Sequence, residues 1–266
     1  LRWIDPISEL AFLVMDLAVR GRADLGTLLL NSWVEASGDG EGLRGWAWYS
    51  VYRALVRAKV SWLRLKQSGL AAAESSRIQT ELASYLRLAM NWIQRQSQPL
   101  VLMHGLAGSG KSTVAVALSQ QLGAVVFRSD VERKRLFGLL GVKPTRLLEG
   151  ELYGQAASRH LYGNTLPALV EAASAGGLAV IVDACFLRRS ERQRMVALAG
   201  KLGIPVQIVV CTAPEPLLRQ RLLERAAAGS DPSDATVEVL QSQQNWLEPL
   251  EPDEKGLVMA AEELAP

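Results

Sequence analysis

Residues 105–112, Gly-Leu-Ala-Gly-Ser-Gly-Lys-Ser, carry the spacing of glycines, lysine and serine that binds nucleotide phosphates. Glycines let consecutive backbone N–H groups turn toward an anion, and a helix expected from residue 113 adds partial positive charge. We expect Lys111 to reach the β- and γ-phosphates and Ser112 to bind Mg²⁺. The alternative is a glycine-rich turn with a chance lysine. The predicted nucleotide contacts are Gly105, Leu106, Ala107, Gly108, Ser109, Gly110, Lys111, Ser112 and Thr113.

A carboxylate follows the next apolar stretch, residues 124–128. Asp130 lies where a parallel strand would end, and ligands bind at that edge of an open sheet. It is therefore a candidate base that takes the proton of an attacking hydroxyl. Arg133 lies one helical turn further on and suits a substrate that carries a phosphate. The alternative is that Asp130 only caps a helix over residues 131–137.

A third strand end carries Asp183, after the apolar residues 178–182. An Asp at this place in a phosphate-binding fold commonly orders Mg²⁺, directly or through water. A role facing the substrate is the other interpretation. Arg188 and Arg189 follow in the loop, where they either line an acceptor site or begin a solvated helix.

An arginine-rich helix is expected from residue 217, and a polar stretch follows it at residues 228–234. Arg221 and Arg225 are four residues apart and share one face. Helix, polar turn and helix with arginines form a lid at about residues 219–234, which would bring guanidinium charge onto a transferring phosphoryl group and exclude water. The alternative is an ordinary basic surface helix.

Two parts of the chain must position these residues. From residue 98, short apolar stretches alternate with helical ones, which indicates an α/β fold with a parallel five-stranded sheet. Residues 1–97 show only helical periodicity and hold six of the seven tryptophans, so we expect a separate helical segment there. The predicted strands lie at residues 100–104, 124–128, 178–182, 206–211 and 257–260.

Composition narrows the functional classes. The chain has 266 residues with 29 basic and 27 acidic side chains. Residues 98–266 carry 17 basic against 18 acidic side chains, which argues against a long nucleic acid as substrate. The chain has only two cysteines, which favours a reducing compartment, the cytoplasm. No apolar run approaches 20 residues, so we expect no membrane span. The chain opens on Leu rather than Met, and we expect a fragment of a longer protein.

Residues 105–112, Asp130 with Arg133, residues 183–186 and the Arg221/Arg225 helix together resemble the P-loop kinases of the polynucleotide-kinase and zeta-toxin-like group. The resemblance covers about residues 99–250 and is closest to bacterial predicted kinases described as AAA-type ATP-binding proteins. It implies ATP with Mg²⁺ and transfer of the γ-phosphate to a hydroxyl. By this resemblance Asp130 is the base, Arg133 contacts the substrate, and Arg221 and Arg225 belong to the lid.

In those kinases a phosphotransferase-like domain precedes the P-loop domain. Residues 1–17 look like the far end of the C-terminal lobe of an aminoglycoside phosphotransferase-like domain. The catalytic His-Gly-Asp loop of that family has no counterpart here, so the N-terminal helices are not expected to transfer phosphate. A missing lobe predicts an exposed apolar surface on residues 1–95.

Three functions remain open at this point. The first is an ATP-dependent kinase that acts on a hydroxyl of a small molecule. The second is a regulatory module that binds ATP and hydrolyses it slowly. The third is a kinase of nucleic-acid 5′-hydroxyl ends. Asp130 with Arg133 favours the kinase interpretations, because a pure switch needs no base to activate a hydroxyl.

Overall fold

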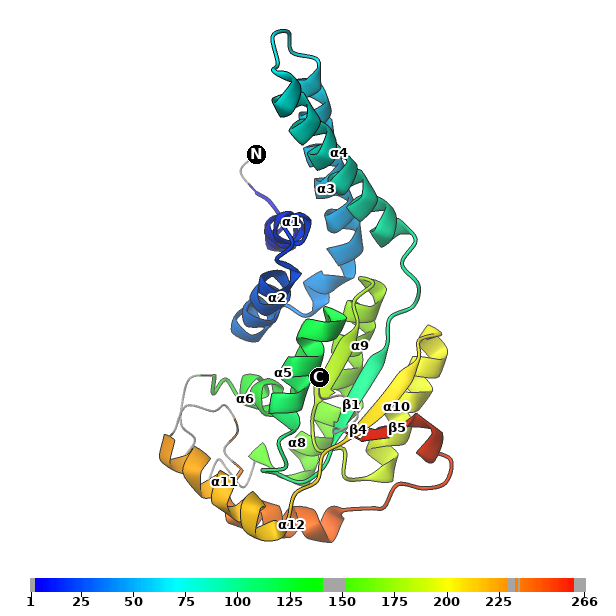
Figure 1. Cartoon of the computed structure of the whole chain (residues 1–266). Coiled ribbons are helices and arrows are strands. Elements are labelled where there is room, and N and C mark those ends of the chain that lie inside the picture. The colour runs from blue at the N-terminus through cyan, green and yellow to red at the C-terminus, as the bar shows by residue number, and fades with distance from the viewer. Residues whose placement is uncertain (1–2, 141–151, 229–232, 234, 261–266) are drawn as a thin grey trace. The chain divides into compact units, whose positions relative to one another are not determined.

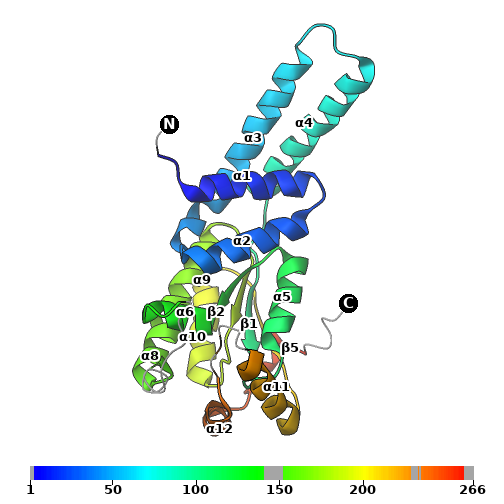
Figure 2. The ribbon, with the colours of Figure 1, turned by 90° about the vertical axis from the view of Figure 1, so that its left-hand side faces the viewer.

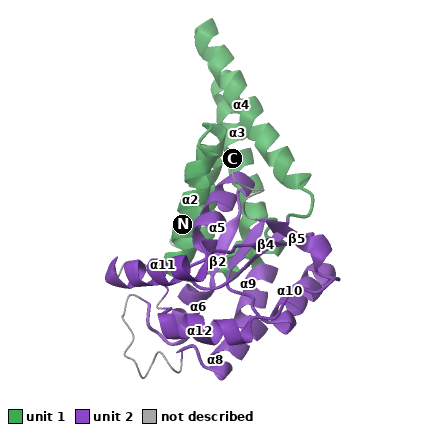
Figure 3. Cartoon of the chain, turned by 60° about the horizontal axis from the view of Figure 1, so that its bottom comes forward, with its two compact units in different colours: residues 1–98, 172–178 green, residues 99–171, 179–266 purple. Residues whose placement is uncertain are grey.

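The computed structural model describes the chain except for residues 1–2, 141–151, 229–232, 234 and 261–266 (Figure 1). It divides the chain into two units, coloured separately in Figure 3. Unit 1 comprises residues 1–98 and 172–178, and unit 2 comprises residues 99–171 and 179–266. In the described ranges, no helix is long and apolar enough to cross a membrane.

Unit 1 is helical, as its periodicity predicts. The described helices of its long segment are α1 (Pro6–Val19), α2 (Ala23–Ser37), the 3₁₀ turn η1 (Glu41–Gly45), α3 (Trp46–Leu65) and α4 (Ala72–Ile93). Helices α3 and α4 form an antiparallel hairpin, with α1 packed across it (Figure 2). Small residues at the crossings, such as Ala54, Ala58 and Ala89, let these helices approach closely around the buried Met15 and Tyr85.

A polar network fixes this crossing. The Tyr85 hydroxyl donates to Asp16 Oδ1 at 2.6 Å and accepts from Arg57 Nε at 3.1 Å. Arg57 also pairs with Glu81 at 3.1 Å. Because burial would otherwise leave the hydroxyl unsatisfied, these contacts select one register of α1 on the hairpin.

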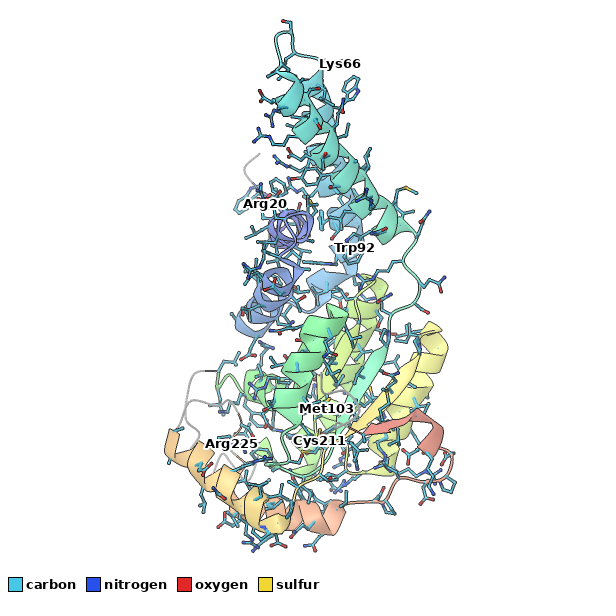
Figure 4. All side chains as sticks on the ribbon, viewed as in Figure 1. Arg20, Lys66, Trp92, Met103, Cys211 and Arg225 are labelled. Carbon is cyan, nitrogen blue, oxygen red and sulfur yellow. The ribbon has the colours of Figure 1, made fainter. Side chains whose placement is uncertain are left out.

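Large apolar side chains are exposed on unit 1, as expected. Trp48 and Tyr52 are stacked on α3 with ring centroids 5.3 Å apart, and both are exposed. Trp62 and Leu63 lie exposed further along the same helix, near Lys66, which is labelled in Figure 4. Apolar surface of this kind commonly marks an interaction face.

Residues 172–178 correct the predicted boundary, which assigned all of residues 98–266 to one domain. This segment clusters with residues 1–98 instead. A Cβ added to Gly176 would lie 2.0 Å from the Leu43 carbonyl oxygen, and one on Gly177 would meet the Trp92 ring at 3.5 Å. The segment therefore packs directly on helical residues of unit 1, a long-range contact that local periodicity does not contain.

Unit 2 is built on the expected parallel sheet. Its strands are β1 (Leu100–His104), β2 (Val125–Arg128), β3 (Val180–Asp183), β4 (Val206–Val210) and β5 (Val258–Ala260). The spatial order is β2-β3-β1-β4-β5, and every pairing is parallel. The fold predicted from alternating strands and helices is confirmed. The strand order reverses at β1, so the carboxyl edge beside this strand is the expected ligand site.

Helices cover both faces of the sheet. Figures 1 and 2 show α5 on one face and α9 and α10 on the other, as right-handed crossovers require. Buried residues of α5 pack on β1, β3 and β4 in a cluster that contains Met103 and Cys211 (Figure 4). The described helices and helical turns are α5 (Lys111–Leu122), α6 (Ser129–Leu136), α8 (Gln155–His160), η2 (Leu161–Thr165), α9 (Leu166–Ala175), α10 (Arg189–Leu202), α11 (Glu215–Ala228), α12 (Val237–Trp246) and η3 (Lys255–Leu257). The end of α9, from residue 172, belongs to unit 1.

The turn after β1 depends on one glycine. Gly105 has φ +142°, and a Cβ at this position would lie 2.2 Å from the carbonyl oxygen of Cys211, which follows β4. An overlap with backbone cannot be relieved by a side-chain rotation. The neighbouring strand end thus forces the loop to start with glycine.

Gly105→Ala should therefore lower the free energy of unfolding by at least about 2 kcal/mol, because it adds backbone strain to a steric overlap. Gly200→Ala is the matched control, since this residue of α10 has open space around it. The control should raise stability by roughly 0.5 kcal/mol. Urea unfolding of the full chain measures both variants. Equal stability of the two would contradict the packing described for the turn.

Candidate active site

The glycine-rich loop connects β1 to the first residue of α5, as its sequence predicts. Gly105 N donates to the Cys185 carbonyl oxygen at 3.2 Å, which fixes the loop to the segment after β3. Gly108 has φ +81°, and a Cβ there would lie 2.8 Å from the Leu218 carbonyl oxygen of α11. The loop is thus enclosed by backbone on two sides, and its amides precede the N-terminus of α5, where an anion is stabilised.

A cavity of about 230 Å³ opens in front of this loop, and we call it the P-loop cavity. It brings together most of the residues singled out by sequence, although Gly105, Leu106 and Ser109 are not in its wall. The predicted residues that line it are Ala107, Gly108, Gly110, Lys111, Ser112, Thr113, Asp130, Asp183, Arg221 and Arg225.

Two cationic side chains that line this cavity donate hydrogen bonds to carbonyl oxygens of the loop itself. Lys111 Nζ donates to Leu106 O at 2.8 Å, and Arg221 Nη1 donates to Gly108 O at 3.1 Å. Arg225 Nη2 donates to Ala235 O at 3.4 Å. These are single hydrogen bonds to neutral acceptors. A phosphate oxygen would offer each cation a stronger, charge-assisted partner.

Asp183 ends β3 beside the loop. Its residue is 7% exposed, and burial raises the pKa of its carboxyl group. A hydrogen bond from Ser112 and the nearby charges of Lys111 and Arg128 oppose that shift. Arg128 lies directly opposite Asp183 in the β2–β3 register, with Nε 3.6 Å from Oδ2. A buried carboxylate and a hydroxyl are thereby held together at the edge of the cavity.

Asp130 lies in the first turn of α6, whose N-cap residue is Arg128. No side-chain cap hydrogen bond forms at this helix start, and Asp130 makes no hydrogen bond to a described residue. The alternative that Asp130 serves only as the cap of this helix is therefore wrong for the described geometry. Its carboxylate lines the cavity and is available to a ligand.

A second cavity of about 180 Å³, the side cavity, adjoins the first. Ser129, Asp130, Tyr153, Cys185 and Gln243 line both, so the two cavities meet at Asp130. The predicted substrate residues Arg133 and Arg188 line the side cavity and not the P-loop cavity. The structure thus separates the P-loop cavity from an adjacent cavity, with Asp130 at their junction.

Helix α12 supplies residues that the sequence did not indicate. Gln243 Oε1 accepts from Ala107 N at 2.8 Å, and its Nε2 lies 3.5 Å from Cys185 Sγ. Val239, Gln243 and Trp246 recur at helical spacing and line the side cavity. A glutamine in a polar helix gives no signal of such a role. Trp246, however, is the one tryptophan outside the N-terminal segment and could have drawn attention to this helix.

Helices α11 and α12 pack on the loop through a small apolar cluster. Its buried members are Ala107, Leu218, Leu222, Ala235 and Leu240. Arg225, labelled in Figure 4, extends from α11 within the predicted lid. Residues 229–232 and 234 of that lid lie outside the described residues, so its closure stays a prediction.

The buried Arg192 of α10 holds the wall of the side cavity in place. Its exposed fraction is 0%, and it donates to both carboxylate oxygens of Glu254 at 2.6 and 2.9 Å. It also donates to the carbonyl oxygens of Phe186, Leu187, Glu248 and Pro249. One guanidinium thus joins the segment after β3 to the segment after α12. This buried pair gave no signal in the sequence, because its partners are 62 residues apart.

The sheet order and the Gly-Lys-Ser loop between β1 and α5 define unit 2 as a P-loop NTPase fold of the kinase type. The chain belongs to the AAA domain family, whose model matches residues 100–250.

Its relatives include the uncharacterized protein Rv2004c of Mycobacterium tuberculosis, with 32% identity over 241 residues. This match covers 90% of the chain and 46% of that relative, so the chain spans about half the length of the curated relatives it matches. A tRNA dimethylallyltransferase of Anaeromyxobacter dehalogenans is 32% identical over 134 residues, which cover 48% of the chain and 42% of that enzyme.

Solved structures that resemble this chain have lower sequence identity than these relatives. One is a putative kinase from Chloroflexus aurantiacus, with 23% identity and a TM-score of 0.46. The match covers 62% of this chain and 88% of that one. APS kinase CysC of Mycobacterium tuberculosis, in complex with AMPPNP and APS, has 21% identity and a TM-score of 0.43. The match covers 95% of that chain and 63% of this one.

We expect the stability of the folded chain to depend on pH through His104, the last residue of β1. Burial lowers the pKa of its imidazole, and Nδ1 lies 3.1 Å from the Phe186 carbonyl oxygen. Because a carbonyl can only accept, Nδ1 carries the hydrogen. The folded state therefore resists protonation at a pH where the unfolded chain, near its usual pKa of about 6.5, binds a proton.

Stability should be full above about pH 6.5 and fall as the pH drops from there toward the lowered pKa, by up to about 1.4 kcal/mol per pH unit. Thermal unfolding midpoints between pH 7.5 and 5 measure this slope. His104→Gln should flatten it, because the variant has no imidazole to protonate on unfolding. A slope in His104→Gln equal to that of the unmodified chain would show that His104 does not titrate on unfolding.

Proposed function

We propose that this chain is an ATP-dependent kinase that transfers the γ-phosphoryl group to a hydroxyl of a small molecule. The observation that carries the proposal is the position of Asp130 at the junction of the P-loop cavity and the side cavity. A nucleotide whose phosphates lie on the loop would direct its γ-phosphate toward this carboxylate. An acceptor in the side cavity would approach from the other side.

In this proposal the acceptor hydroxyl oxygen forms a bond to the γ-phosphorus while the bond to the β,γ-bridging oxygen breaks, and ADP leaves. Asp130 takes the hydroxyl proton as the attack develops. Lys111 and Arg221 leave their loop carbonyls and donate to phosphate oxygens, where negative charge must be stabilised. Gln243, bound to the Ala107 amide, keeps α12 against the loop so that both cavities stay adjacent.

The residues present fit a magnesium ion. Ser112 and Asp183 offer a hydroxyl and a buried carboxylate in contact with each other, and Mg²⁺ commonly takes one or two such ligands besides phosphate oxygens and water. In the described part of the chain, no group of three or more acidic, histidine or cysteine side chains forms a cage for a metal. When bound, the ion would neutralise charge on the phosphates.

A separate proposal concerns the N-terminal helices. We propose that unit 1 is the distal part of an aminoglycoside phosphotransferase-like lobe, as residues 1–17 resemble one. The exposed side chains of Trp48, Tyr52 and Trp62 support an apolar face that the rest of such a lobe would cover. Co-expression of the part of a full-length relative that this chain does not cover should yield a complex that depends on these three residues.

Asp130→Asn tests the kinase. The change keeps the size of the side chain and removes the proton acceptor. Acceptor-dependent ADP release should fall by roughly 10²–10⁴-fold, with MgATP affinity almost constant. The acceptor is first found by screening sugars, nucleosides, aminoglycosides and DNA ends. Lys111→Ala is the control, since it should lose MgATP binding in calorimetry together with transfer.

Two results would overturn this function. Unchanged transfer in Asp130→Asn would remove Asp130 from the chemistry. If no acceptor raises ADP release above basal hydrolysis while MgATP still binds, the regulatory module takes its place. Preferred transfer to DNA ends would instead identify a nucleic-acid kinase.

A further inference from the structure

Tyr162 lines the side cavity and has no role in the mechanism proposed above. The residue is half-buried, and its hydroxyl makes no hydrogen bond to a described residue. Burial raises the pKa of the phenol well above its usual value, so the group stays protonated and keeps a hydrogen to donate. Because removal of a donor from water is unfavourable unless a partner replaces the water, this hydroxyl is a candidate donor to a bound molecule.

The groups around the Tyr162 hydroxyl show that it faces this cavity. Besides burial, four nearby ionisable side chains influence the pKa of the phenol, and all four line the side cavity: Glu191, Cys185, Arg133 and Asp130. Helix α6, which carries Asp130, packs on the turn η2, which carries Tyr162. A molecule whose hydroxyl reaches the Asp130 carboxylate therefore lies beside the phenol as well.

Two unusual backbone segments fix the direction of the Tyr162 ring. The residue belongs to η2, a π turn in which Leu166 N donates to Leu161 O, and such turns are rare and frequent at functional sites. The ring packs edge-on against Phe186, with centroids 5.4 Å apart, and Phe186 has φ +44°. Phe186 is held in turn, because its carbonyl oxygen accepts from Arg192 Nη1 at 3.2 Å. The phenol is thus oriented before any ligand binds.

We propose that Tyr162 is a specificity-determining residue whose hydroxyl donates a hydrogen bond to a second oxygen of the acceptor, beside the hydroxyl whose proton Asp130 takes. The acceptor is then a polyol with at least two neighbouring oxygen atoms. A hydrogen bond from the phenol to the attacking oxygen itself would withdraw electron density from it and slow its attack on phosphorus, so the second oxygen is the better partner. This inference rests on the proposed kinase function for the reaction, but the hydrogen bond is measurable by binding alone.

Binding of polyols to the nucleotide-loaded chain tests this hydrogen bond separately from transfer. With Mg²⁺ and a non-hydrolysable ATP analogue present, saturation-transfer NMR measures the dissociation constants of monosaccharides, of nucleosides and of the monodeoxy analogues of each. At least one parent compound should bind about 5- to 100-fold more tightly than the analogue that lacks the oxygen bound by Tyr162. In Tyr162→Phe the parent should bind as weakly as that analogue, and the analogue should bind as before. A merely structural change would weaken both.

Tyr52→Phe is the matched control, because it removes the same hydroxyl from an exposed tyrosine of α3 that lies outside the cavity wall. It should leave the dissociation constants of parent and analogue unchanged. The thermal unfolding midpoint of Tyr162→Phe should not fall below that of the unmodified chain, since no hydrogen bond to a described residue is lost. Weaker binding in this variant is then an effect on the ligand and not on the fold.

The outcomes separate this inference from the kinase function. Polyol binding that depends on the Tyr162 hydroxyl supports the inference, and if no acceptor then raises ADP release, the binding site stands and the kinase is wrong. Absent polyol binding overturns the inference, and so does binding that Tyr162→Phe leaves unchanged or weakens equally for parent and every analogue. If the chain prefers an acceptor with a single oxygen atom, the kinase stands and the polyol is wrong.

Discussion

The carboxyl edge of the sheet in unit 2 depends on the close approach of backbone to backbone at the glycine-rich loop. Gly105 faces the carbonyl oxygen of Cys211, and Gly108 faces that of Leu218, at distances where no Cβ fits. The end of β1, the end of β4 and the start of α11 are thereby held around one turn. That turn places the N-terminus of α5 at the wall of the P-loop cavity before any ligand is present. Preorganisation of this kind spares the reorganisation that a flexible loop would need at the moment of reaction.

A second constraint acts on the neighbouring side cavity. Arg192 donates to Glu254, to the Leu187 carbonyl oxygen and to the Pro249 carbonyl oxygen. These bonds hold the segment that carries Arg188 against the segment after α12. Phe186, which the same guanidinium binds, has φ +44° and packs edge-on against Tyr162. A residue in this backbone region persists only where its surroundings determine it. The glycine-rich loop thus depends on Gly105 and Gly108, and the wall of the side cavity depends on the buried Arg192–Glu254 ion pair.

The sequence predicts the first of these constraints and not the second. Glycine spacing, the apolar strands and the helices between them are local signals, and they predict both the sheet and the phosphate loop. Asp130 follows from its position at a strand end. Gln243, Arg192 and Glu254 could not be found in this way, because each acts on a partner 58 to 136 residues away and lies in a segment without distinctive composition. Residues 172–178 illustrate the same limit, since their packing on Leu43 and Trp92 leaves no periodic trace.

By the mechanism proposed above, a nucleotide on the loop presents its γ-phosphate to Asp130 where the two cavities meet. A crystal structure of the full chain with Mg²⁺ and a non-hydrolysable ATP analogue tests it most directly. We expect phosphates on the amides of the loop and Lys111 Nζ moved from Leu106 O onto a phosphate oxygen. The γ-phosphate should face Asp130, with the side cavity open behind it. A nucleotide bound elsewhere, or a γ-phosphate directed away from Asp130, would contradict it.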